Sequence, residues 1–203
     1  MNRQAENIAG TTDTGLRRVV AIVALLNLAY FGLEFVVALA IGSVSLFADS
    51  ADFFEDAAVN FLIFMALAWT AARRARVGMA LAGILLLPAV AFVWALWSKF
   101  NAPLPPAPMP LTITGLGALV VNLCCAFLLA RYRRHSGSLT KAAFLSARND
   151  AYANIAIIGA GLVTAVHASV WPDVVVGLGI ASMNVDAAAE VWSAARSERQ
   201  AHS

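Results

Sequence analysis

Residues 27–60 read NLAYFGLEFVVALAIGSVSLFADSADFFEDAAVN, and this stretch decides the fold of the chain. Two mostly apolar runs flank the Gly42-Ser43 pair, which predicts two helices joined by a tight turn. Several carboxylates lie within these runs. Further along the chain, residues 77–97 and 111–130 each form a run of about twenty residues without a charge, the length that a helix needs to cross the hydrocarbon of a bilayer.

The composition is typical of a chain that faces lipid. Hydrophobic residues make up 61% of the 203 residues and charged residues 13%, with a mean hydropathy of +0.75, whereas a soluble domain carries about a quarter charged residues. Backbone groups in lipid must be satisfied within the segment, so the apolar runs are expected to be helical. We therefore predict an all-α integral membrane bundle of six transmembrane helices, at 18–40, 46–72, 77–98, 111–131, 142–168 and 172–194.

The organisation around these spans is simple. We predict a cytoplasmic N-terminal tail (1–15), a six-helix transmembrane domain (16–195) and a short C-terminal tail (196–203). Proline disfavours helix, so the link between the third and fourth spans is expected to be extended; its prolines are Pro103, Pro105, Pro106, Pro108 and Pro110.

The distribution of basic residues predicts the orientation. Of the 14 Lys and Arg residues, all but Lys99 would lie on one side of the membrane, and an excess of basic residues marks the cytoplasmic side. Both termini are therefore expected in the cytoplasm. The basic residues bracket the apolar runs and form no patch, so nucleic acid is not an expected partner. The polar start lacks the layout of a signal peptide.

Carboxylates inside the spans give the functional signal. Each costs roughly 2.5–3.5 kcal/mol at a helix centre on insertion scales, and such residues mark ion pathways. They fall in the first, second and fifth spans: Glu34, Asp49, Asp52, Glu55, Asp56 and Asp150. Asp49, Asp52 and Asp56 follow i, i+3, i+7 spacing, which puts them on one face of a helix. Asp150 and Asn154 repeat the one-turn spacing of Asp52 and Asp56.

The depth of these residues is consistent with one shared site. Counted from the outer end of the second span, Asp52 and Asp56 lie roughly 10–17 Å deep; counted from the inner end of the fifth span, Asp150 and Asn154 lie roughly 15–22 Å deep. In a core about 30 Å thick, the two pairs meet near the midplane. We predict that these four residues form a metal site.

Glu34 and Asp49 are expected to support that site or its pathway. For Asp49, a role in capping or structural hydrogen bonding is an equal alternative. Glu55 points off the acidic face and is expected either to support the ligands from behind or to lie at the membrane interface, and not to be a ligand. The competing interpretation of the acids, that they cap helix ends or pair with arginine, is disfavoured because the second span, which carries four of them, contains no basic residue. Asn27, Asn60 and Asn122 are expected to form interhelical hydrogen bonds.

Two parts of the chain resemble the cation diffusion facilitator, or cation efflux, family. The family pattern is a glutamate in the first helix, a Gly-Ser turn, a Leu-x-x-Asp step and a His/Asp-x-x-x-Asp pair, which correspond here to Glu34, Gly42-Ser43, Leu46 to Asp49, and Asp52 with Asp56. The stretch ARNDAYANIAIIGAG (147–161) and the tripeptide Trp171-Pro172-Asp173 are similar to the family's fifth and sixth helices.

The resemblance implies a six-helix, usually dimeric protein that exports zinc, manganese, iron, cobalt or cadmium from the cytoplasm in exchange for protons, by alternating access. It implies a multi-pass protein of the cell membrane with no permanently bound cofactor. The family's transport ligands map onto Asp52, Asp56, Asp150 and Asn154. Position 154 departs from the pattern because the family normally has an aspartate there, and the site contains no histidine. The chain is expected to be a short form without the family's C-terminal cytoplasmic domain.

The predicted ligand atoms narrow the choice of transported ion only in part. An all-oxygen site favours harder ions such as manganese, iron(II) or magnesium, although zinc and cobalt also accept carboxylate. A non-transporting homologue that senses metal or assists assembly remains an alternative, with Asn154 as the sign of a degraded site. A membrane enzyme is not expected, because neither a His-Glu-x-x-His run nor a Gly-x-Gly-Asp signature occurs.

Overall fold

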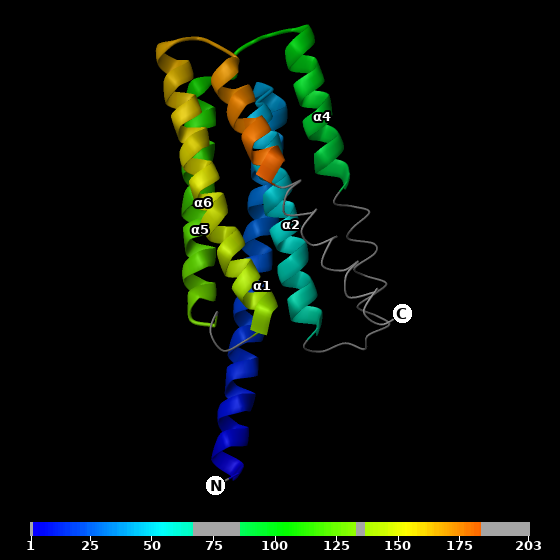
Figure 1. Cartoon of the computed structure of the whole chain (residues 1–203), viewed down its shortest axis with the longest axis vertical. Helices are drawn as coiled ribbons and strands as arrows, with labels where there is room; N and C mark the ends of the chain where they lie inside the picture. Colours follow the sequence, from blue (N-terminus) through cyan, green and yellow to red (C-terminus); the bar gives the residue numbers. More distant parts are fainter. Residues whose placement is uncertain (1, 67–85, 133–136, 184–203) are drawn as a thin grey trace.

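The computed structural model describes residues 2–66, 86–132 and 137–183. Within these ranges the chain forms a bundle of helices and no strand, which confirms the all-α prediction (Figure 1). The helices are α1 (Asn2–Ile41), α2 (Val44–Ala66), α4 (Leu86–Asn101), α5 (Pro108–Ala130), α6 (Gly137–Val166) and a final described helix, Trp171–Met183.

The predicted spans coincide with these helices where the structure describes them. Helix α1 continues back to Asn2 and so includes most of the range predicted as an N-terminal tail; it extends past the rest of the bundle in Figure 1. The end of the second span (67–72), the start of the third (77–85), the end of the sixth (184–194) and the tail at 196–203 lie outside the described residues.

The extended linker is shorter than the one that we predicted from its prolines. Residues 103–107 have no regular structure, but Pro108 and Pro110 belong to α5, whose N-cap is Ala107. The prediction was wrong at these two positions because the first turn of a helix has no partner for its N–H groups, so proline costs nothing there and its fixed φ suits the helix.

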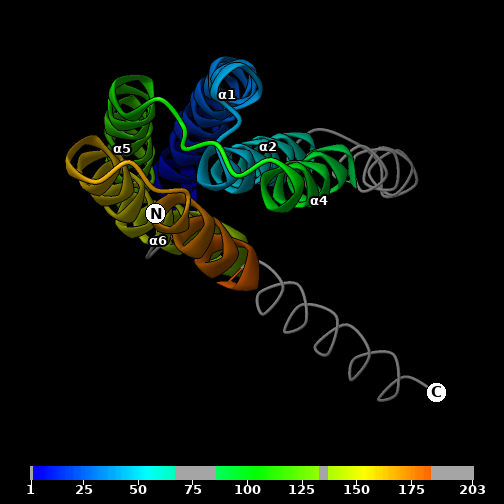
Figure 2. The same ribbon diagram turned by 90° about the horizontal axis from the view of Figure 1, so that it is seen from above.

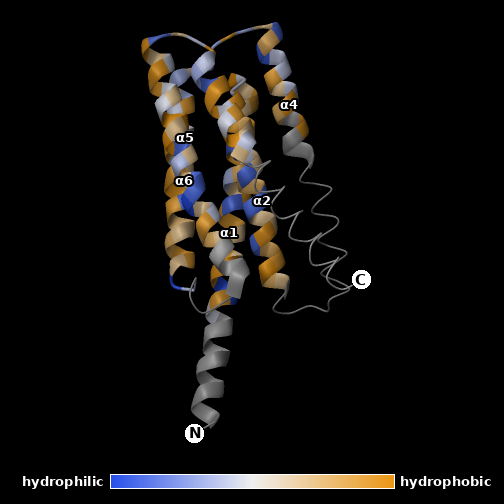
Figure 3. Ribbon diagram, viewed as in Figure 1, coloured by the Kyte–Doolittle hydropathy of each residue, from blue (hydrophilic) through white to orange (hydrophobic). Residues whose placement is uncertain are grey.

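Two stretches in the described residues pass a combined test of length and apolar character for crossing a membrane, Gly15–Ile41 and Pro108–Ala130. Helix α2 carries four carboxylates, and α6 has polar side chains near its middle, among them Asp150 and Asn154. Figure 3 shows hydrophilic, blue segments of ribbon within both helices. Neither of the two helices that hold the predicted site passes this test over its described residues.

The helices pack as two pairs, α1 with α2 and α5 with α6, and the pairs meet through α1–α5 and α2–α6 contacts (Figure 2). Helix α4 packs against α2. Many large apolar side chains point outward, for example Phe127 at 81% and Trp97 at 70% exposure. In a bilayer this surface contacts lipid, so its exposure does not carry the cost that it would in water.

The turn between α1 and α2 depends on glycine. Gly42 has a φ of 62°, in the left-handed region that glycine adopts without strain. The helix ends there, and Val44 begins α2 after a single intervening residue, Ser43. The predicted tight Gly-Ser turn is confirmed, and it fixes the depth at which the acidic face of α2 begins.

Candidate metal-transport site

The acidic face of α2 is buried. Asp49, Asp52 and Asp56 are 0%, 8% and 7% exposed, as the i, i+3, i+7 spacing predicts for one helix face. Glu55 is exposed, so it does point away from this face. Three buried carboxylates on one face of a membrane helix require compensation from the helices that pack against it.

Helix α6 brings a fourth carboxylate, Asp150, to the part of this face that holds Asp52 and Asp56. Asp150 lies close enough to Asp52 and Asp56 for the three charges to interact. One turn earlier on α6, the Ser146 hydroxyl donates a hydrogen bond of 3.0 Å to Oδ1 of Asp56. The structure therefore brings together three of the four predicted ligands, between α2 and α6.

The fourth predicted ligand, Asn154, belongs to a neighbouring group of polar residues. Its Nδ2 donates to Oδ2 of Asp49 at 2.7 Å, and its Oδ1 accepts from Nδ2 of Asn122 on α5 at 3.0 Å. Asn154 and Asp49 are fully buried and Asn122 is 2% exposed. Both polar atoms of the Asn154 amide are thus engaged by side chains other than the three carboxylates, and its role as a ligand stays a prediction.

Glu34 completes this second group from α1. Its side chain is fully buried and interacts with Asp49. Within the described residues, no hydrogen bond is formed by either carboxyl oxygen of Glu34 or by Oδ1 of Asp49. The two acids predicted to support the site therefore lie together, linked to α6 and α5 through Asn154 and Asn122.

The carboxylates do not close into a cage in this conformation. In the part of the chain that the structure describes, no set of three or more His, Cys, Asp or Glu side chains is arranged to hold a metal ion. Joint coordination of one cation by Asp52, Asp56 and Asp150 would require these side chains to move closer together.

Not every predicted polar contact forms. Asn122 does bond across helices, as expected, but Asn60 donates to the backbone oxygen of Asp56 on its own helix, so that prediction was wrong. An asparagine can reach back one turn to a carbonyl of its own helix, which satisfies its N–H group without a partner helix. The Oδ1 atom of Asn27 accepts a weak contact from the Cys125 thiol at 3.8 Å.

The sequence analysis assigned no role to two residues near the site, Ser146 and Asp173. Ser146 carries a signal that could have found it, because it lies one turn from Asp150 on the same face of α6. Asp173, in the helix Trp171–Met183, was noted only for its place in the family pattern. It is fully buried, and its carboxylate accepts hydrogen bonds from the first turn of α2.

Asp173 acts as an N-cap supplied by another helix. Its Oδ2 accepts the backbone N–H of Val44 at 2.8 Å. Its Oδ1 accepts the Ser45 N–H at 3.1 Å and the Ser43 and Ser45 hydroxyls at 2.6 Å each. A carboxylate at a helix N-terminus is favoured by the helix dipole. This contact anchors the start of the helix that carries Asp49, Asp52 and Asp56.

One comparison with known proteins finds a family. The model of the cation efflux transmembrane domain matches residues 20–198. A search of curated proteins finds no match. The matched range contains both polar groups and Asp173 as well.

Proposed function

The chain belongs to the cation efflux family of membrane transport proteins, and we propose that it exports a divalent metal cation from the cytoplasm in exchange for protons. Transport would follow alternating access, in the cell membrane, with the chain acting as a homodimer formed through its transmembrane helices. The candidate cargo ions are zinc, manganese, iron, cobalt and cadmium.

One observation carries this proposal, the group of three interacting carboxylates between α2 and α6. Like charges within a poorly polar interior repel, and either bound protons or a divalent cation relieves that repulsion. A site that holds protons in one state and a cation in another is what an antiporter requires. Asp52, Asp56 and Asp150 are the residues that we assign to this exchange.

The donor atoms bear on the choice of ion. The three carboxylates and, after rearrangement, the Asn154 carbonyl would offer only oxygen, which suits manganese and iron(II) better than a soft-ligand site does. Asn154 cannot carry a proton, so proton exchange falls to the three acids. Asp49 and Glu34 would shape the pathway beside them.

Flux into proteoliposomes tests the assignment. The full chain is reconstituted, a pH gradient is imposed, and uptake of each candidate metal is compared for wild type, Asp52→Ala and Asp150→Ala. Asn149→Ala serves as the matched control, because it removes an exposed polar side chain next to Asp150 on α6. We expect the two site variants to lose flux and the control to keep it; equal flux in all four proteins would overturn the site.

The same measurement addresses a non-transporting, metal-sensing role. That alternative draws on the engagement of the Asn154 amide by Asp49 and Asn122. Metal binding by the wild-type chain without flux of any of the ions would favour the sensor, whereas flux driven by the pH gradient excludes it.

A further inference from the structure

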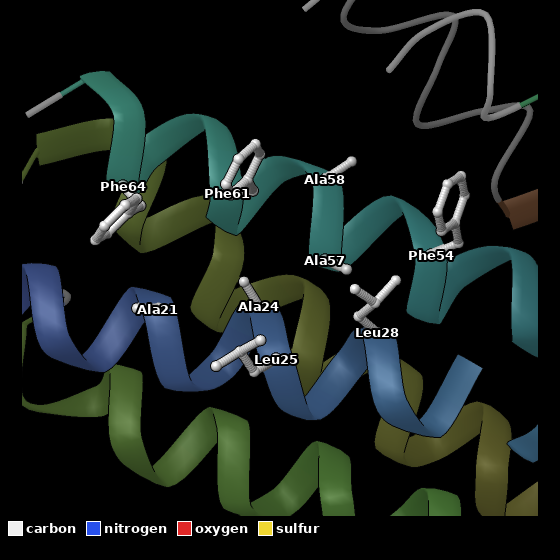
Figure 4. A pocket seen from close by; sticks show the side chains of 9 residues that line it. All are labelled: Ala21, Ala24, Leu25, Leu28, Phe54, Ala57, Ala58, Phe61 and Phe64. Carbon is white, nitrogen blue, oxygen red and sulfur yellow. The ribbon is translucent and has the colours of Figure 1, made fainter. Parts of the chain in front are cut away.

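An apolar groove of about 410 Å³ runs along the seam between α1 and α2 (Figure 4). Two helical stripes line it, one from α1 and one from α2: Ala21, Ala24, Leu25 and Leu28, and Phe54, Ala57, Ala58, Phe61 and Phe64. Both follow the spacing that puts side chains on one helix face. In Figure 4 the side chains of Ala24 and Leu28 rise from α1 toward α2, and Phe64 reaches from α2 toward α1.

The groove has a deep floor and an open side. Its alanines are largely buried, with Ala24 at 8% and Ala57 at 6% exposure, whereas Leu25 and Leu28 are 66% and 48% exposed. The short alanine side chains leave space that larger residues at these positions would fill. The volume falls within the range of small-molecule sites, roughly 300–1,000 Å³.

The two ends of the groove differ in chemistry. At one end the Phe54 ring packs against Phe31, with 4.8 Å between the ring centres. At the other end the guanidinium carbon of Arg17 lies 4.7 Å from the centre of the Phe64 ring. Arg17 is exposed and belongs to the first turn of the membrane-length stretch Gly15–Ile41. The groove is thus apolar along its length, with a cation at the end that lies near the start of this membrane-length stretch.

We propose that this groove binds an anionic phospholipid, with one acyl chain against the alanine floor and the phosphate on Arg17. Arg17 is exposed beside the Phe64 ring, and the N–H groups of a guanidinium suit bidentate contact with phosphate oxygens. The predicted orientation puts this end on the cytoplasmic side, where the leaflet is anionic. An apolar helix of a second copy would fill the groove but supply no anion to Arg17.

This site is independent of the transport proposal, since its residues lie on the other side of α2 from the acids. Lipid binding tests it directly. The full chain in detergent is mixed with phosphatidylglycerol or phosphatidylcholine with the same acyl chains, and retained lipids are counted by native mass spectrometry. One basic residue contributes about 1 kcal/mol to binding an anionic surface, so we expect about five-fold better retention of phosphatidylglycerol.

Matched variants separate a defined site from general affinity for lipid. Arg17→Gln should reduce phosphatidylglycerol retention to the level of phosphatidylcholine, whereas Arg18→Gln, about 100° away on the helix, should not. Ala21→Leu should lower retention of both lipids by filling the groove, and Ala40→Leu, an exposed alanine of α1 outside the groove, should not.

Three outcomes would overturn the proposal. Equal losses in the Arg17→Gln and Arg18→Gln proteins would mean diffuse attraction to basic residues. Unchanged retention in Ala21→Leu would mean that the acyl chain lies elsewhere. A dimer lost in Ala21→Leu while lipid stays bound would assign the groove to a second copy of the chain.

Discussion

Replacing Asp173 with alanine should loosen the start of α2 and lower the stability of the whole bundle. The side chain is fully buried and accepts four hydrogen bonds of 2.6–3.1 Å from residues 43–45. Alanine removes every acceptor at once. The N–H groups of Val44 and Ser45 then lose their cap, and the hydroxyls of Ser43 and Ser45 lose their strongest acceptor.

The cost follows from these contacts. Loss of an N-cap costs about 1 kcal/mol, and each buried hydroxyl left without its acceptor costs about 1 kcal/mol. The sum is about 3 kcal/mol for Asp173→Ala. Asp173→Asn keeps one acceptor oxygen in place but loses the charge and turns an N–H group toward a donor, so we expect about half that cost.

Thermal unfolding in detergent, followed by tryptophan fluorescence, measures both variants. For a chain of this size 1 kcal/mol corresponds to about 2–4 °C, so Asp173→Ala should lower the Tm by about 6–12 °C and Asp173→Asn by about half as much. Glu55→Ala, which removes an exposed carboxylate from α2, should change the Tm little. Equal and small shifts in all three proteins would refute the cap.

Further changes probe the turn and the two polar groups. Gly42→Ala should cost about 1–2 kcal/mol, because its φ of 62° is strained for any residue with a Cβ, and the same melting experiment measures it. Asn154→Asp replaces the amide that donates to Asp49 with a second carboxylate; in the flux assay we expect altered ion preference or pH dependence, and an unchanged profile would remove Asn154 from the site. Ser146→Ala removes the hydroxyl on Asp56, and we expect an altered KM for metal with little change in Tm; a changed Tm with an unchanged KM would assign the serine to packing alone.

The acidic face of α2 could be predicted from the sequence because helical periodicity is a local property. The spacing of Asp49, Asp52 and Asp56 fixes their common face whatever surrounds the helix, and their cost in lipid predicts that the face is buried. The pairing of α2 with α6 followed from depth alone, since membrane thickness limits where two polar positions can meet.

The contacts that the sequence did not predict depend on distant partners. Asp173 caps a helix that begins 129 positions earlier in the chain, and no local pattern distinguishes this role from a cap of its own helix. Asn154 has the spacing of a ligand, yet its orientation is set by Asn122, 32 positions away on α5. Spacing determines which face a side chain occupies, while its hydrogen-bond partners depend on tertiary packing.

The hydrogen bonds between α2 and α6 use the same atoms that a cation would need. Ser146 occupies Oδ1 of Asp56, and Asn154 occupies Oδ2 of Asp49 while its own carbonyl accepts from Asn122. A cation that binds Oδ1 of Asp56 and the carbonyl oxygen of Asn154 competes with the hydrogen bonds that these atoms accept. Because those bonds also join α2 to α6, and α6 to α5, we expect metal loading to change how the three helices pack, whereas the Asp173 cap holds the start of α2 in place. Cargo binding and helix rearrangement would then be linked through the same few polar atoms.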